Sequence, residues 1–285
     1  MDFLRPYQGF GNISLIEPVA NSNYHSLQTA VNRRFKDGLL LGINYTWSKA
    51  LGTVSADLPG ITAIGAPRPD GNQRLANYGP LDFDRTHTFI ANFVYLLPRT
   101  NRGGVMGGIL NDWQVSGVYR WQTGQPYTIQ VSIPGISPYT LTGTQQLEGA
   151  RVVINGDPGP GHSSDPYRMF DTSVFSAPRP GSLGLESGRN TMNRAPTNTL
   201  DLSVAKRIGL GGGRHLELRL DAFNALNHTQ YFDVNSTLNV RSLTDPTPTN
   251  LPYDAAGNLV NPTGFGAVTN VRPSRQVQLL ARFQF

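Results

Sequence analysis

The chain has 285 residues, of which only 15% are Asp, Glu, Lys or Arg, whereas soluble domains carry about 25%. Its formal net charge is +5, but the 24 Lys and Arg residues are scattered rather than gathered into runs, so we expect no nucleic-acid binding. The chain contains no cysteine, which excludes disulfides, thiolate metal sites and a cysteine nucleophile. This low content of charged residues is typical of a protein whose surface is partly in contact with lipid.

Apolar and polar residues alternate in the first two predicted strands. Residues 24–35 place Leu27, Thr29, Val31 and Phe35 on one face, and the opposite face carries polar residues that include Arg34. Lys36-Asp37-Gly38 then forms a short hairpin turn. The second strand covers residues 39–50, and its apolar face holds Leu39, Leu41, Ile43, Tyr45 and Trp47. This pattern predicts strands rather than helices.

The same alternation recurs in five later segments of about ten residues, the length that a tilted strand needs to cross a bilayer. These segments are residues 85–97, 113–123, 198–208, 214–222 and 276–285. Aromatic residues lie near several strand ends, as the girdles of a membrane barrel require. No stretch reaches the roughly 18 apolar residues of a transmembrane helix. We therefore predict an all-β fold with seven antiparallel membrane strands in a meander.

The connections between these strands alternate in length. The short ones follow Phe35, Leu97 and Ile208, and the long ones, of about 35, 75 and 50 residues, follow Ala50, Thr123 and Ala225. Outer-membrane barrels have this asymmetry, with short periplasmic turns and long extracellular loops. The pattern therefore predicts an antiparallel transmembrane β-barrel segment of the bacterial outer membrane, with Phe285 on the periplasmic side.

Seven strands leave two open sheet edges, and in lipid each unsatisfied backbone group costs several kcal/mol. Single-chain bacterial barrels also use even strand numbers. Either residues 4–20 supply an eighth strand, or the chain is part of a larger barrel, which is what we expect. The N-terminal Met-Asp-Phe-Leu-Arg-Pro has no basic segment followed by an apolar core, so no signal peptide is predicted.

A series of short motifs resembles one receptor family. The motifs are Arg5-Pro6-Tyr7 with Gly9-Phe10-Gly11, Asn21-Ser22-Asn23-Tyr24-His25-Ser26-Leu27-Gln28, Tyr45-Thr46-Trp47-Ser48-Lys49-Ala50-Leu51, Asp112-Trp113-Gln114-Val115-Ser116-Gly117 with Gly124-Gln125-Pro126, Gly188-Arg189-Asn190 and Phe223-Asn224-Ala225-Leu226-Asn227-His228. In this order they resemble the C-terminal barrel of TonB-dependent receptors of the Oar-like type, whose N-terminus carries a carboxypeptidase-regulatory-like domain.

The resemblance implies a barrel of about 22 strands, plugged by an N-terminal domain and energised through TonB. Residues 1–285 would form one domain, the C-terminal part of that barrel, without plug or TonB-box-like segment. We therefore expect no active transport by this chain alone. The implied partners are outer-membrane lipid, the rest of the barrel and the plug, TonB indirectly, and the barrel-assembly machinery. The assembly signal would be Leu279, Ala281, Phe283 and Phe285.

Charged side chains on the predicted polar strand faces are the best candidates for function. They are Arg34, Arg120, Asp201, Arg207, Glu217, Arg219, Asp221 and Arg282. An Arg or Lys facing lipid at mid-bilayer costs about 2–4 kcal/mol, so we expect these residues to face the barrel lumen. Two roles remain open: a cross-strand charge ladder that fixes register, or contact with a plug in the complete receptor.

We expect no enzyme activity, cofactor or metal site. The five histidines show no zinc spacing, and no nucleophile elbow is present. Asp82 and Asp84 are too few for calcium and are expected to be polar residues of an extracellular strand end. The long loops are expected either to capture a ligand or to be surface cover. Two other classes of protein stay open: a complete small passive barrel, such as a porin or adhesin, and a soluble β-sandwich binding module.

Overall fold

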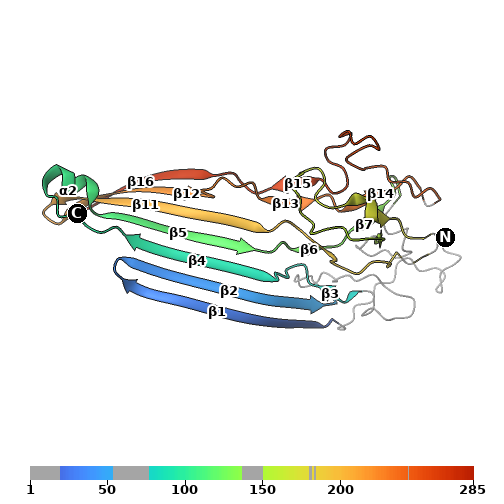
Figure 1. Cartoon of the computed structure of the whole chain (residues 1–285), viewed down its shortest axis with the longest axis horizontal. Coiled ribbons are helices and arrows are strands. Elements are labelled where there is room, and N and C mark those ends of the chain that lie inside the picture. The colour runs from blue at the N-terminus through green and yellow to red at the C-terminus, as the bar shows by residue number, and fades with distance from the viewer. Residues whose placement is uncertain (1–19, 54–76, 137–149, 180–181, 183, 243) are drawn as a thin grey trace, which may run out of the picture.

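A long antiparallel sheet dominates the computed structural model, which describes residues 20–53, 77–136, 150–179, 182, 184–242 and 244–285 (Figure 1). In spatial order its strands are β1 (Ser22–Lys36), β2 (Leu39–Gly52), β4 (His87–Leu96), β5 (Trp113–Gln122), β11 (Thr197–Gly211), β12 (Arg214–Phe223) and β16 (Gln276–Gln284). The two-residue strand β3 (Gly79–Pro80) pairs with the end of β2. Spatial order follows chain order throughout, so the predicted all-β meander of seven long strands is confirmed.

The sheet has two unlike ends, which we call the turn end and the loop end. At the turn end, Asp37 and Gly38 join β1 to β2 with φ of 53° and 78°, the positive values that a tight hairpin turn of this kind needs. Gly212 and Gly213 join β11 to β12 in the same way, with positive φ. At the loop end lie the ends of the strands that the long connections join, which are β2 with β4, β5 with β11 and β12 with β16 (Figure 1).

The structure adds a helix that the sequence analysis did not predict. It is α2 (Gly104–Leu110), which lies between β4 and β5 at the turn end (Figure 1). The helix has seven residues, three of them glycine, so helical periodicity is hard to detect in it. None of the helices that the structure describes is long and apolar enough to span a membrane.

Strand register gives the sheet two chemically different faces. Val204 lies opposite Val115 and Leu220, and Leu220 lies opposite Leu279, so one continuous row is apolar. We call this side the apolar face. The neighbouring row places Ser203 opposite Ser116 and Asp221, and it belongs to the charged face. Packing on the apolar face is close at Gly117, where an added Cβ would lie within 3 Å of Phe93 and Leu202.

One predicted face assignment was wrong. The alternation placed Phe35 with Leu27 and Val31, opposite Arg34. In the structure, the register between β1 and β2 shifts between Arg33 and Lys36, and Phe35 lines a cavity together with residues of the charged face. An extra residue in one strand reverses the inside-outside alternation beyond it, so a strictly two-residue period fails at this point.

The long connections form a second layer of structure at the loop end. Their short elements are β6 (Pro126–Tyr127), β7 (Gln130–Ser132), β8 (Val153–Ile154), η2 (Thr172–Val174), β9 (Phe175–Ser176), β10 (Met192–Asn193), β13 (Tyr231–Val234), β14 (Thr237–Asn239) and β15 (Val268–Val271). These strands pair as β6 with β10, β8 with β9, β13 with β15 and, in parallel, β7 with β14. The last pair joins two different long connections.

The principal hydrophobic core lies among these connections rather than in the sheet. Its buried residues are Tyr127, Ile129, Val131, Ile133, Ala150, Val152, Met169, Phe170, Phe175, Met192, Val234, Leu238, Val240 and Phe265, which we call the loop core. Phe170, Phe175 and Phe265 pack edge to face, with ring centroids 5.1–5.6 Å apart. The loops were predicted as ligand-capturing or surface segments, and the structure shows that much of them folds as a packed unit.

The outer strands of the sheet, β1 and β16, each pair with one neighbour among the described residues. The described strands therefore form an open sheet rather than a closed barrel. The eighth strand that the sequence allowed at residues 4–20 lies almost entirely outside the described residues, which begin at Ala20.

Candidate functional site

The loop end of the apolar face carries a cluster of aromatic side chains. Tyr45 Oη and His87 Nδ1 lie 2.9 Å apart and share a hydrogen bond, and their rings stack with centroids 6.2 Å apart. The His87 ring lies 6.3 Å from that of Trp121, and Phe89 packs edge to face on Tyr119 at 6.0 Å. Aromatic rings with polar edges are suited to the boundary between lipid and water.

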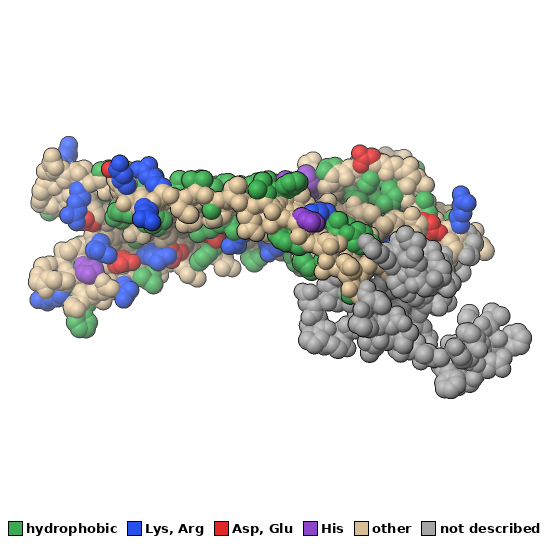
Figure 2. Space-filling model, turned by 90° about the horizontal axis from the view of Figure 1, so that it is seen from below, with side chains coloured by type: hydrophobic (Ala, Val, Ile, Leu, Met, Phe, Trp, Pro, Cys, Tyr) green, Lys and Arg blue, Asp and Glu red, His purple; other side chains and the backbone are tan. Residues whose placement is uncertain are grey.

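The turn end of the same face carries a second aromatic group. Tyr95 lies opposite Leu39 and Val115, and Trp113 lies opposite Lys206. Phe283 lies opposite Leu216, and its ring is 6.1 Å from that of Phe285. Aliphatic residues fill the band between the two aromatic groups, and Figure 2 shows hydrophobic side chains along the middle of the sheet. This is the banded surface of an outer-membrane barrel wall.

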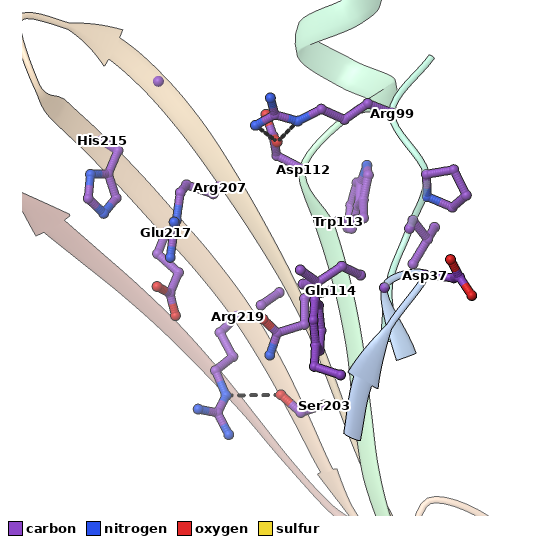
Figure 3. Close-up of a pocket in the computed structure, with 17 residues that line it drawn as sticks. Asp37, Arg99, Asp112, Trp113, Gln114, Ser203, Arg207, His215, Glu217 and Arg219 are labelled. Carbon is purple, nitrogen blue, oxygen red and sulfur yellow. Dashed lines mark hydrogen bonds and ion pairs between the residues drawn. The ribbon is translucent and has the colours of Figure 1, made fainter. Parts of the chain in front are cut away.

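The charged face holds a cavity of about 910 Å³ at the turn end (Figure 3). Its polar lining from the long strands includes Gln114, Ser203, Arg207, Glu217 and Arg219. Further lining residues come from the turn between β1 and β2 and from the segments next to α2. Figure 2 shows Lys, Arg, Asp and Glu side chains gathered at this end of the molecule.

Three of the eight predicted charges line this cavity: Arg207, Glu217 and Arg219. Strand register places Glu217 opposite both Arg207 and Arg282, so a fourth charge lies in the same cross-strand row. Arg219 Nε donates to Ser203 Oγ at 2.9 Å and to Asp221 Oδ1 at 2.8 Å. Arg219–Asp221 is the one ion pair formed among the eight side chains. The structure therefore brings together five of the eight predicted residues.

The other three predicted charges lie apart from this group. Arg120 is exposed on β5, opposite Ile90 and Thr199 and nearer to the loop end. Arg34 lies on the edge strand β1, within its register shift. Asp201 accepts a hydrogen bond from the backbone N–H of Asn224 at 2.9 Å, which fixes the chain where it leaves β12. These residues do not belong to one site with Arg219.

The predicted C-terminal signal lies on the apolar face. Leu279 is opposite Leu220, Ala281 is opposite Leu218, and Phe283 is opposite Leu216. The Phe285 side chain is fully exposed just beyond the end of β16. The alternation on which the predicted signal depends is thus present, and its reading by assembly machinery stays a prediction.

Polar contacts attach the long connections to the sheet and to one another. Asp84 is buried, and it accepts hydrogen bonds from Lys49 Nζ at 2.8 Å and from the backbone N–H of Ala50 at 2.7 Å. Asp82 accepts a hydrogen bond from Asn190 Nδ2 at 2.6 Å. Both carboxylates thus have protein partners and lie in the segment between β3 and β4.

Arg151 is a fully buried charge that sequence reasoning missed. Its guanidinium donates to Asn77 Oδ1 at 3.1 Å and to the Ser187 carbonyl at 3.3 Å, so it ties two long connections together. The signal available in the sequence was the pair of apolar neighbours, Ala150 and Val152, which flank Arg151 just before the short strand β8. A charge within such a segment needs buried partners.

A group of arginines lies where the sheet meets the loop core. Burial lowers the pKa of Arg85, and the positive charges of Arg272 and Arg194 lower it further. Arg194 also lies over the ring of Tyr127, 5.6 Å from its centroid, and pairs with Asp233 at 3.0 Å. Burial raises the pKa of the Tyr127 phenol. Within the described residues no group of three His, Asp or Glu side chains is placed to hold a metal ion.

Comparison with known families identifies this architecture. The chain matches the model of the family described as an outer membrane beta barrel domain, over residues 1–278. The chain belongs to this family. No curated protein and no solved structure matches it.

Membership of the outer membrane beta barrel family places the protein in the bacterial outer membrane. The apolar face, with its two aromatic groups, is then the surface that meets lipid, and the charged face is directed away from it. The alternative of a soluble β-sandwich is excluded, because its apolar faces would have to pack as a dry core. In this protein they are the membrane surface.

Proposed function

We propose that the protein is part of the wall of a TonB-dependent receptor of the Oar-like type, which takes up a ligand bound by extracellular loops. The observation that carries this proposal is the direction of the two outer strands. β1 and β16 are the first and seventh strands of an antiparallel meander, so they run in the same direction. Joining them directly would give a parallel seam, whereas bacterial barrels are antiparallel with even strand numbers.

An odd number of further strands is therefore needed between β16 and β1. A receptor barrel of about 22 strands would supply about 15 of them. Barrels of this size enclose a lumen that is filled by a plug. The resemblance of the strand and turn motifs to Oar-like receptors leads to the same size of barrel.

The charged face supports a lumen that holds a protein partner. Arg207, Glu217 and Arg219 line a cavity of about 910 Å³ that opens on this face. Side chains of both signs in one cavity can pair with a folded plug, whose surface also carries charges of both signs. The partner would approach from the turn end, which is periplasmic if the long loops are extracellular.

The loop core supports ligand capture at the cell surface. Because its aromatic and aliphatic side chains are packed, the segments that carry them are held in fixed positions. Because these loops are already ordered, binding a ligand costs less conformational entropy and the affinity is higher. The cavity on the charged face and the loop core lie at opposite ends of the sheet, as a receptor needs if it binds a ligand outside and couples to a partner in the periplasm.

The first experiment measures whether the chain alone forms a pore. The purified chain is refolded into planar lipid bilayers, and its conductance is recorded. A wall segment gives no stable open channel, because its edge strands lack partners. A steady, reproducible channel would instead support a complete small passive barrel, for which an eighth strand would have to come from residues 4–20.

The second experiment tests the plug contact in the complete receptor. The double variant Arg219→Ala with Asp221→Ala removes the ion pair on the charged face. Its matched control is Arg241→Ala with Asp245→Ala, which removes a 2.7 Å Arg–Asp pair from the loop end. We expect loss of plug retention and of energised uptake only in the first variant. Equal uptake and equal plug retention in both variants would contradict the plug role.

A further inference from the structure

Helix α2 exposes an apolar surface at the turn end of the sheet. Val105, Met106, Ile109 and Leu110 are all exposed, Val105 to 83%. Their spacing of three and four residues places them on neighbouring positions of one helical surface. We call these four residues the apolar foot. The remaining residues of the helix, Gly104, Gly107 and Gly108, carry no side chain.

The sequence of α2 gives the helix little intrinsic stability. Three of its seven residues are glycine, its N-cap Gly103 offers no side-chain hydrogen bond, and neither end carries a charge that favours the helix dipole. Helices this short depend on packing of an apolar surface. Among the described residues the apolar foot stays exposed, so a partner outside them would supply this packing.

Two contacts fix the base of the foot. Asn111 Oδ1 accepts a hydrogen bond from the backbone N–H of Thr100 at 2.6 Å. Asp112 Oδ1 pairs with Arg99 at 2.5 Å. At Gly107, the buried residue of the helix, a Cβ would collide with the Arg102 carbonyl, so this position lies against the connecting segment, whereas the space around Gly104 and Gly108 is open. The four apolar side chains are exposed.

The neighbouring side chains place the foot beside lipid. Trp113 and Lys206 are cross-strand partners on the apolar face, and Trp113 also lines the cavity at the turn end. Trp113 Nε1 donates to the Ile109 carbonyl at 2.8 Å, and Lys206 Nζ donates to the Asn111 carbonyl. Lys206 Nζ also lies 5.4 Å from the centre of the Trp113 ring. The end of α2 is thus attached to the aromatic group that borders the lipid band.

We infer that the apolar foot inserts into the membrane interface at the turn end and anchors the barrel wall in the adjacent leaflet. Its occupant is phospholipid: acyl chains for the four apolar side chains, and headgroup phosphates for the exposed cation Arg102, whereas Lys206 is buried and attaches the end of the helix to the sheet. A tryptophan and a lysine beside a short apolar helix are the residues that settle at this depth of a bilayer. The foot continues the lipid surface of the strands beyond their ends. It requires the outer-membrane setting but not the receptor function.

Site-directed spin labelling tests the foot, because the chain has no cysteine of its own. Nitroxides are placed through Ile109→Cys, Leu220→Cys and Leu210→Cys, and the chain is reconstituted in phosphatidylethanolamine–phosphatidylglycerol vesicles. Leu220 lies in the lipid band, and Leu210 is an exposed apolar residue near the turn-end limit of β11. Collisions with oxygen report lipid, and collisions with an aqueous nickel chelate report water.

We expect the ratio of oxygen to nickel collisions at position 109 to lie severalfold above that at 210 and below that at 220. A ratio at 109 equal to that at 210 would show a foot in water and overturn the inference. Protection of 109 from both reagents would show that protein covers it, which also overturns it. Lipid contact at position 220 alone would support the barrel assignment and overturn the inference about the apolar foot. Absence of lipid contact at all three positions would contradict both the barrel assignment and the inference.

Discussion

Truncation of Phe265 tests whether the loops are one packed unit. Phe265 is fully buried, and its ring lies 5.1 Å from that of Phe170 and 5.6 Å from that of Phe175. Phe265→Ala removes the ring that both others contact. Replacing a buried Phe by Ala costs about 3–5 kcal/mol, because apolar burial is lost and a cavity remains. The opening equilibrium of the loop core should therefore rise by roughly two to three and a half orders of magnitude.

Hydrogen exchange measured by mass spectrometry follows this opening peptide by peptide. In Phe265→Ala we expect faster exchange in residues 127–133 and 231–240, which belong to the loop core but are far from Phe265 in sequence. The strands of the long sheet should keep their protection, since they make their own ladders of hydrogen bonds. The matched control is Phe283→Ala, which truncates an exposed phenylalanine on the apolar face.

An unchanged exchange rate in the loop core of Phe265→Ala would refute the reasoning, because a packed core cannot lose its central ring without cost. Faster exchange confined to residues next to Phe265 would also contradict it. That result would mean that the loops are separate segments whose stability is local.

Three shorter predictions follow from single contacts. Asp84→Ala leaves Lys49 and a backbone N–H without their buried acceptor, and should lower stability by about 1–3 kcal/mol in thermal unfolding. Gly117→Val overpacks the apolar face where an added Cβ already meets atoms at 2.8 Å, and should reduce the folded, heat-modifiable fraction on gels. Hydrogen bonds from Ser173 hold the pKa of Asp171 below its usual 3.8, so their stabilisation is present above that pH and is lost as pH falls through the lower folded value. Protection of η2 should fall in this acidic range in the wild type but not in Asp171→Asn.

The long strands could be predicted from sequence because the membrane constrains their residue pattern in a simple way. One face meets lipid and the other does not, so apolar and polar residues alternate with a period of two. Rows such as Val115, Val204 and Leu220 follow directly from that rule. The rule fails where the backbone departs from strict alternation. Phe35 is the clearest case, because the register shift in β1 moves it to the cavity side.

The loop core could not be predicted in the same way, because its contacts join segments that are distant in sequence. β7 pairs in parallel with β14, which belongs to another connection. Alternation was visible in Tyr127, Ile129, Val131 and Ile133, but a single alternating segment does not reveal its partner. Helix α2 was missed for a different reason: its glycines give no polar face, so the usual amphipathic pattern is absent.

Two of the motifs, Gly188-Arg189-Asn190 and Phe223-Asn224-Ala225-Leu226-Asn227-His228, act as structural joints, whereas Arg5-Pro6-Tyr7 with Gly9-Phe10-Gly11 lies outside the described residues. Asn190, from Gly188-Arg189-Asn190, has a φ of 53°, and it donates to the Pro80 carbonyl at 2.7 Å as well as to Asp82. Asn224 also has positive φ, and it exchanges hydrogen bonds with the backbone of His228. Residues in such conformations are constrained by geometry, because few side chains accept positive φ. These two motifs therefore specify how loops are attached to the wall. In the proposed receptor, the determinants of ligand choice should lie elsewhere, on exposed loop residues outside these joints.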